Sequence, residues 1–210
     1  MKAPSKKVRG LFRESRRSVF PRLADPFSLE EKQGIKMTGK SFLKKVTNGE
    51  IDIIQILLSL AEETGSAYCV IGGLAVNAYA EPVVSLDLDL VVVSDRIEAF
   101  CESARSKGMK AEEFEHSLNL SATGSDLRIQ LQTDPRYQDF IPRAQRREVL
   151  GYEMAVACIK DVLKGKTWAF ADETRRKSKR QKDLADIMRL VEAHPELKKE
   201  LPPEIAAQLD

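Results

Sequence analysis

Two short motifs of the sequence combine residue types that could bind phosphates and a metal ion. Gly72 and Gly73 end an apolar run, and Asp87 and Asp89 follow further along the chain with one residue between them. Glycines let backbone N–H groups approach phosphate oxygens closely at the start of a helix. Carboxylates are hard oxygen ligands for Mg²⁺, which also takes phosphate oxygens and water. The two motifs therefore predict a site for phosphates and Mg²⁺ or Mn²⁺.

The segments around these motifs predict a strand, a glycine turn, a helix and a second strand. Residues 67–71 form a short apolar run, residues 74–79 have helical character, and residues 83–93 alternate leucine with Asp87 and Asp89. The two-residue period of a strand places both carboxylates on one face. A tight turn and a solvated strand face would explain the same residues without a ligand. However, two acids within an apolar run are costly unless they bind something.

The remaining periodic segments predict a protein of mixed α/β (α+β) class. It would have a mixed central sheet flanked by helices and a helical C-terminal region. In the alternating segment 127–132, Arg128, Gln130 and Gln132 share one strand face. Further helices are expected over residues 42–63 with a break at Asn48-Gly49, 96–107, 155–163, 164–171 and 182–193, and a strand or hairpin arm over residues 111–120.

Charge is distributed unevenly along the chain. Residues 1–36 contain ten Lys and Arg against four Asp and Glu, a net charge of +6, so the whole-chain charge of +2 leaves −4 for residues 37–210. Prolines and basic residues without a hydrophobic period predict that residues 1–36 are a basic tail, either disordered or an artefact of the start site. The predicted core spans residues 37–150, and the helical region spans residues 151–210.

The two motifs together resemble the core pattern of the DNA-polymerase-β-like nucleotidyltransferase superfamily. That pattern is an apolar residue, Gly-Gly or Gly-Ser, a gap, and Asp-x-Asp on the next strand. Here Ile71 precedes the glycine pair, and residues 74–86 separate it from Asp87. The resemblance implies a nucleotidyltransferase-type core in which Asp87 and Asp89 hold the metal ion and act in catalysis, while Gly72, Gly73 and Ser85 hold phosphates of an NTP.

Two downstream motifs resemble AbiEii-type nucleotidyltransferase toxins of type IV toxin–antitoxin systems. They read GKTWA at residues 165–169 and RQKDLADI at residues 180–187. The resemblance implies that Lys166 and Asp183 assist nucleotide binding and catalysis. It also implies transfer of a nucleotide to an acceptor, which is tRNA in some members, and a cognate antitoxin protein as partner. A solvated helix face or an ion pair would explain Lys166 and Asp183 without a role in catalysis.

Gln130 departs from the superfamily pattern, which places a third carboxylate on the strand beside Asp-x-Asp. An amide oxygen can contact a cation or a nucleotide, but it cannot act as a base or contribute charge. Asp126 and Asp134 could replace the missing acid only if the strand register differs. Gln130 therefore supports an alternative, a catalytically inactive nucleotidyltransferase fold that binds a nucleotide or a protein. Ser85 likewise has two interpretations, a phosphate contact or a hydrogen bond to its own backbone.

Composition argues against several other classes of protein. Apolar runs such as residues 53–60 are shorter than the roughly 20 residues that span a bilayer, and no signal peptide opens the chain, so a cytoplasmic protein without membrane contact is expected. The cysteines and histidines form no metal-ligand pattern: Cys69, Cys101, Cys158, His116 and His194. A nucleic-acid-binding adaptor that uses the basic tail is the remaining alternative.

Overall fold

The computed structural model describes residues 39–115 and 117–209, so the predicted basic tail and His116 lie outside the described residues. The helices are α1 (Gly39–Val46), α2 (Ile53–Glu63), α3 (Gly72–Val76), α4 (Ile97–Ser106), α5 (Ile159–Ala171), α6 (Lys177–Ala193) and α7 (Pro203–Ala206), with 3₁₀ helices η2 (Ser94–Arg96), η3 (Pro135–Arg143) and η4 (Pro195–Glu200). The strands are β1 (Tyr68–Ile71), β2 (Asp87–Val92), β3 (Lys110–Phe114), β4 (Ser117–Ser121), β5 (Arg128–Gln132), β6 (Gln145–Val149) and β7 (Tyr152–Val156).

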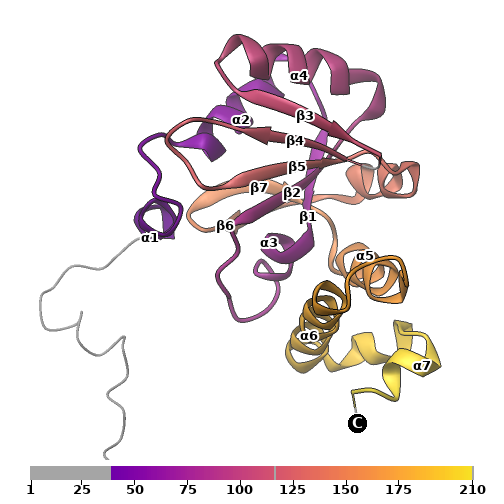
Figure 1. The fold of residues 1–210 in the computed structure, drawn as a ribbon. Helices are drawn as coiled ribbons and strands as arrows, with labels where there is room; N and C mark the ends of the chain where they lie inside the picture. The colour runs from indigo at the N-terminus through magenta and orange to yellow at the C-terminus, as the bar shows by residue number, and fades with distance from the viewer. Residues whose placement is uncertain (1–38, 116, 210) are drawn as a thin grey trace, which may run out of the picture. The chain divides into compact units, whose positions relative to one another are not determined.

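The strands form one seven-stranded mixed sheet in the order β3-β4-β5-β2-β1-β7-β6. β2 runs parallel to β5, and β1 runs parallel to β7, whereas all other neighbouring strands are antiparallel. Helices α2 and α4 lie on one face of the sheet, and α3, α5 and α6 lie on the other (Figure 1). This arrangement confirms the predicted fold class, a mixed sheet flanked by helices with a helical C-terminal region.

Alternation along the central strands separates the core from the candidate site. Leu88 and Leu90 of β2 and Ile129 and Leu131 of β5 are fully buried in the hydrophobic core. Burying such a side chain contributes about 1.5–3 kcal/mol to the free energy of folding. The intervening side chains of both strands are less buried and belong to the opposite face, because successive residues of a strand point to opposite sides. Core packing therefore fixes which polar residues face the helices α3, α5 and α6.

The prediction of a helix over residues 155–163 is wrong in its first half. Residues up to Val156 belong to β7, which pairs with β6 as a hairpin and with β1 in parallel. α5 starts only at Ile159 and continues through the second predicted helix as a single helix. Tyr152, Met154 and Val156 are buried on alternate positions, which is the period of a strand. A short apolar run does not by itself distinguish a strand from a buried helix.

The segment before Asp87 is also less regular than predicted. β2 begins at Asp87, so residues 83–86 precede the strand, and Val83 and Val84 are exposed. The Asn77 side chain holds this loop, because its amide donates to the Val83 carbonyl and its oxygen accepts from the Val83 N–H. In the part of the chain that the structure describes, no helix is long and apolar enough to cross a membrane.

Candidate active site

The turn between β1 and α3 requires a glycine at its first position. Gly72 has φ +68°, a backbone conformation that costs residues with a Cβ roughly 1–2 kcal/mol. A Cβ at Gly72 would also lie 2.8 Å from Cγ of Asp89, which is too close for a stable contact. Gly73 has more room, since a Cβ there would lie 3.4 Å from Oγ of Ser85. Gly72 thus allows the turn to approach the Asp89 carboxylate.

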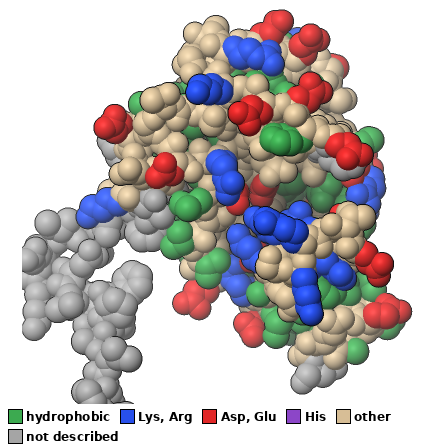
Figure 2. Space-filling model, in the orientation of Figure 1, with side chains coloured by type: hydrophobic (Ala, Val, Ile, Leu, Met, Phe, Trp, Pro, Cys, Tyr) green, Lys and Arg blue, Asp and Glu red, His purple; other side chains and the backbone are tan. Residues whose placement is uncertain are grey.

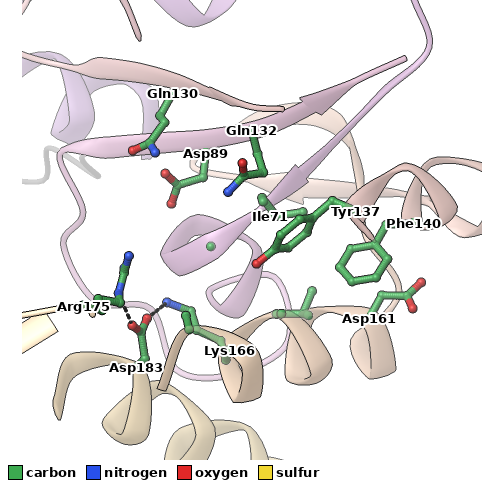
Figure 3. Close-up of a pocket in the computed structure, with 14 residues that line it drawn as sticks. Ile71, Asp89, Gln130, Gln132, Tyr137, Phe140, Asp161, Lys166, Arg175 and Asp183 are labelled. Atoms are coloured by element: carbon green, nitrogen blue, oxygen red, sulfur yellow. Dashed lines mark hydrogen bonds and ion pairs between the residues drawn. The ribbon is translucent and has the colours of Figure 1, made fainter. Parts of the chain in front are cut away.

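The strand register aligns polar side chains of three strands in one row. Asp89 of β2 lies opposite Gln130 of β5, and Gln130 lies opposite Asn119 of β4. Figure 3 shows Asp89, Gln130 and Gln132 pointing into the same space. Within the described ranges, the buried Oδ1 of Asn119 has no hydrogen-bond partner. The position beside Asp89 is therefore held by an amide, and the register brings neither Asp126 nor Asp134 there.

The Asp89 carboxylate lies in the pocket wall, and no hydrogen bond or ion pair joins it to another described residue. Burial raises the pKa of Asp89 above its usual range, because water is replaced by a less polar surrounding. The positive charge of Lys166 opposes this effect, and the negative charge of Asp87 adds to it. A cation bound at Asp89 would compensate for the lost hydration of the carboxylate.

Asp87 has a different environment, although it lies on the same strand face. Its Oδ1 is 2.8 Å from an Nη of Arg128, and its Oδ2 is 4.0 Å from Nζ of Lys179. Its backbone carbonyl accepts a hydrogen bond of 3.1 Å from Oγ of Ser85. The Ser85 hydroxyl therefore fixes the start of β2 through the backbone of Asp87, and a phosphate contact of Ser85 stays a prediction.

The wall opposite the sheet is built by α5 and α6. Lys166 of α5 is buried, and its Nζ lies 2.9 Å from Oδ1 of Asp183 and 2.7 Å from Oδ2 of Asp186. Arg175 adds a contact of 3.0 Å to the other oxygen of Asp183, and Arg189 pairs with Asp186 at 2.8 Å. Burial disfavours a charged ammonium, yet Asp186 and Asp183 outweigh it and raise the pKa of Lys166. Lys166 is therefore charged.

One pocket lies between the sheet and this wall. Of the predicted site residues it is lined by Gly72, Asp89, Gln130, Lys166 and Asp183, whereas Asp87, Gly73 and Ser85 do not line it. Four further side chains with polar groups line the pocket and were not among the predicted site residues: Gln132, Tyr137, Asp161 and Arg175.

Two of these four side chains have a clear place in the site. Arg175 points toward the pocket beside Asp183 (Figure 3). Tyr137 belongs to η3, and its ring lies so close to Gly165 that a Cβ on this glycine would be 3.2 Å from it. A glycine inside the helical motif GKTWA was the signal that another side chain approaches α5. By contrast, Asp161 points away from the pocket and pairs with Arg143 at 2.9 Å.

The donor set suits a cation that arrives with phosphates rather than a permanently bound one. The described residues contain no group of three or more His, Cys, Asp or Glu arranged to hold a metal ion. Asp89 and Gln130 nevertheless lie opposite each other on neighbouring strands, and Asp87 lies two residues from Asp89 on the same face of β2. Mg²⁺ is commonly bound through one or two carboxylates together with phosphates of a substrate. The residues present therefore fit Mg²⁺ or Mn²⁺ in complex with a nucleotide.

Comparison with solved structures relates this fold to nucleotidyltransferases. The structure of ANT(2″)-Ia in complex with adenylyl-2″-tobramycin is similar with a TM-score of 0.53 and 17% sequence identity, over 75% of this chain and 94% of that chain. A nucleotidyltransferase-like protein from Paracoccidioides brasiliensis has a TM-score of 0.47 and 15% identity, over 80% and 91%. No protein-family model and no curated protein matches the sequence. The chain thus has a nucleotidyltransferase fold, which does not by itself define a reaction.

Proposed function

We propose that the protein is a metal-dependent nucleotidyltransferase that moves a nucleotide from an NTP to an acceptor. The observation that carries this proposal is the Asp89 carboxylate, which is half-buried in the pocket wall, unpaired among the described residues, and close to both the Gly72 turn and Gln130. A carboxylate that loses part of its hydration without gaining a partner destabilises a protein, and such groups are enriched where a ligand binds. The pocket beside Asp89 is also lined by two positively charged side chains, Lys166 and Arg175, which could bind phosphates.

In this proposal each group of the chain has a role in binding or orientation. Asp87, Asp89 and the Gln130 oxygen hold the metal ion, which would polarise the phosphate oxygens and lower the pKa of the acceptor hydroxyl. The Gly72-Gly73 turn lies beside the phosphates, and Lys166 with Asp183 forms the opposite wall. The acceptor oxygen forms a bond to the α-phosphorus, the bond to pyrophosphate breaks, and the hydroxyl proton is lost to solvent because Gln130 cannot accept it.

The acceptor class and biological role belong to the same proposal. The motifs around Lys166 and Asp183 resemble those of toxins that act with a cognate antitoxin, and their side chains meet in the structure as a buried ion pair. The basic residues at the start of α6 would attract a polyanion such as tRNA or another RNA. We therefore propose a toxin-like enzyme with an RNA acceptor. The ion pair also stabilises the helix pair in a protein without this role.

A second candidate function follows from Gln130 alone. The register places this amide where the resemblance implies a third carboxylate. Without a third carboxylate, the site has two acids that bind the metal ion, and neither of them is available to deprotonate the acceptor hydroxyl. This favours a protein that binds a nucleotide with its metal ion and transfers nothing. The two candidates differ in one measurable property, which is the transfer of label from the NTP.

The test is an incubation of the full chain with each α-labelled NTP, Mg²⁺ or Mn²⁺ and total tRNA. We expect label on the acceptor with the wild type and a loss of at least about a hundredfold with Asp89→Asn, since metal-held phosphates depend on this carboxylate. Asp87→Asn should lose activity as well. Asp95→Asn is the matched control, because Asp95 is an exposed aspartate of η2.

The result also separates the two candidates. Undiminished label transfer by Asp89→Asn would refute the assignment of the site. If the wild type transfers no label to RNA but binds an NTP only in the presence of Mg²⁺ by calorimetry, the binding protein is the correct interpretation. If it shows neither property, both candidates are wrong.

A further inference from the structure

Asp87 is neutralised from two sides by residues of different elements. Arg128 reaches it from β5, where the parallel register places the two residues opposite each other. Lys179 reaches it from the first turn of α6, across the opening between the sheet and the helix. Asp89, two residues further on the same face, has no such partner among the residues described. Both cations therefore contact Asp87 and not Asp89.

The contacts of these cations are weak enough to be exchanged. The Arg128 side chain is 66% exposed and the Lys179 side chain 40% exposed, and the Lys179 contact is already 4.0 Å long. Exposed ion pairs contribute little to stability because water screens them and long side chains lose freedom. A divalent cation at Asp87 would compete directly with both of them. Its binding would release two positive side chains beside the metal ion.

The released cations would lie where phosphates must be. A metal ion on Asp87 and Asp89 carries the phosphates of its nucleotide on its open side. Lys179 precedes Asp183 by one helical turn, so it lies on the α6 face that points to the pocket. Figure 2 shows Lys and Arg side chains gathered around this part of α6. Arg128 offers a planar guanidinium with several donors, which suits phosphate oxygens.

We propose that Arg128 and Lys179 form the triphosphate site and exchange Asp87 for phosphate oxygens when the metal–nucleotide complex binds. Without ligand they neutralise Asp87, and with ligand they neutralise the phosphates. This inference rests on the proposed function, because it concerns the same ligand. It adds Arg128 and Lys179 to the residues that the motifs indicated. It also explains why two basic side chains contact Asp87, the predicted metal ligand that does not line the pocket.

The exchange predicts that a single substitution changes the affinities for two ligands in opposite directions. Loss of either cation removes a competitor of the metal ion, so Arg128→Gln and Lys179→Gln should each bind Mn²⁺ alone about twofold to fivefold more tightly. The same variants lose a charge-assisted contact to phosphate and should bind inorganic triphosphate with Mg²⁺ about tenfold more weakly. If Arg128 and Lys179 had a purely structural role, their substitution would weaken the binding of both ligands or of neither.

The experiment is titration calorimetry of the full-length wild type and variants with Mn²⁺ and with Mg²⁺–triphosphate. Arg146→Gln is the matched control, because Arg146 is an exposed arginine of β6 paired with Glu153 at 3.8 Å. Circular dichroism confirms that each variant is folded, and two variants on separate elements keep the test decisive if one of them fails. Arg128→Lys retains the charge and should recover part of the triphosphate affinity.

Opposite changes in both variants support the exchange. Unchanged triphosphate affinity, weakened Mn²⁺ binding, or a wild type that binds neither ligand would overturn it. Failure of the proposed function is separate from this outcome. Opposite changes in a wild type that transfers no label would leave the triphosphate site intact and refute only the transferase.

Discussion

At the scale of single residues, Asp87 and Asp89 show how two acids of one strand face acquire different properties. Arg128 and Lys179 neutralise Asp87 at an exposed edge, whereas burial raises the pKa of Asp89. Sequence spacing placed both on the same face but contained no information on their partners, which come from β5 and α6. Asp89 therefore depends on a bound cation more strongly than Asp87 does.

Gly72→Ala should destabilise the protein through two separate effects. The positive φ of Gly72 costs an alanine roughly 1–2 kcal/mol. The added Cβ also meets the Asp89 carboxylate, which should raise the loss in free energy of unfolding to about 3 kcal/mol, since overpacking costs typically 1–3 kcal/mol. Urea denaturation of wild type and variant measures this difference.

Gly65→Ala separates the two effects. Gly65 also has a positive φ, +60°, but a Cβ there would have no heavy atom within 4 Å. Its loss in free energy of unfolding should therefore reflect the backbone conformation alone. Equal losses at Gly65 and Gly72 would contradict the close approach of the turn to Asp89. Truncation of Asp89 to alanine in the Gly72→Ala background should recover part of the additional loss, because the Cβ of residue 89 would still lie 2.9 Å from the added Cβ.

At the scale of elements, the Lys166 ion pairs connect α5 with α6. Among the described residues, Lys166→Met leaves buried Asp183 and Asp186 with Arg175 and Arg189 as ion-pair partners, so the free energy of unfolding should fall by about 3 kcal/mol. Chemical denaturation measures this loss. The control is Lys160→Met, since Lys160 is an exposed residue of α5 paired with Glu200, and a much smaller loss is expected because water screens this pair.

This prediction also determines how an inactive Lys166 variant must be interpreted. If Lys166→Met is as stable as Lys160→Met, the buried pair does not hold the helices together, and any loss of transfer would come from the site itself. If it is strongly destabilised, lost activity reflects the position of α6 as well. Only activity measured on the folded fraction separates the two.

The sequence predicted the elements of the site better than their lateral contacts. Alternation of Leu88 and Leu90 with two acids indicated the carboxylate face of β2, and the structure places Gln130 beside it. The β6–β7 hairpin was missed, because its short run has the same length and composition as a helix start. Tyr137 was missed as well, because tertiary packing brings its ring to Gly165 of α5 from a segment that belongs to neither motif.

At the scale of the whole molecule, the candidate site is assembled from segments far apart in the sequence. Residues from β1, β2, β5, η3, α5 and α6 line the pocket, and the central core is the structure that brings them together. Such a site reduces stability wherever a group is placed for a ligand rather than for a partner in the protein. Asp89 is the clearest example, and its cost should appear in the pH dependence of folding.

Without metal, Asp89→Asn should stabilise the protein increasingly as pH rises. The native pKa of Asp89 is raised above the unfolded value of about 3.9, so wild-type stability from this group is complete below that value and is lost as pH rises through the native pKa. An asparagine does not ionise and avoids this loss. The free energy of unfolding, measured with urea between about pH 4 and pH 7 in the presence of a chelator, should diverge in favour of the variant.

Added Mn²⁺ should reverse this order at neutral pH, because the ion binds the ionised carboxylate of the native wild type and not the amide. Asp95→Asn serves as the control for removal of one exposed negative charge. A constant difference between Asp89→Asn and wild type across the pH range would mean that Asp89 ionises as easily in the folded protein as in the unfolded chain. A divergence that Mn²⁺ abolishes would instead mean that the fold is less stable without its cation because it preserves a site for one.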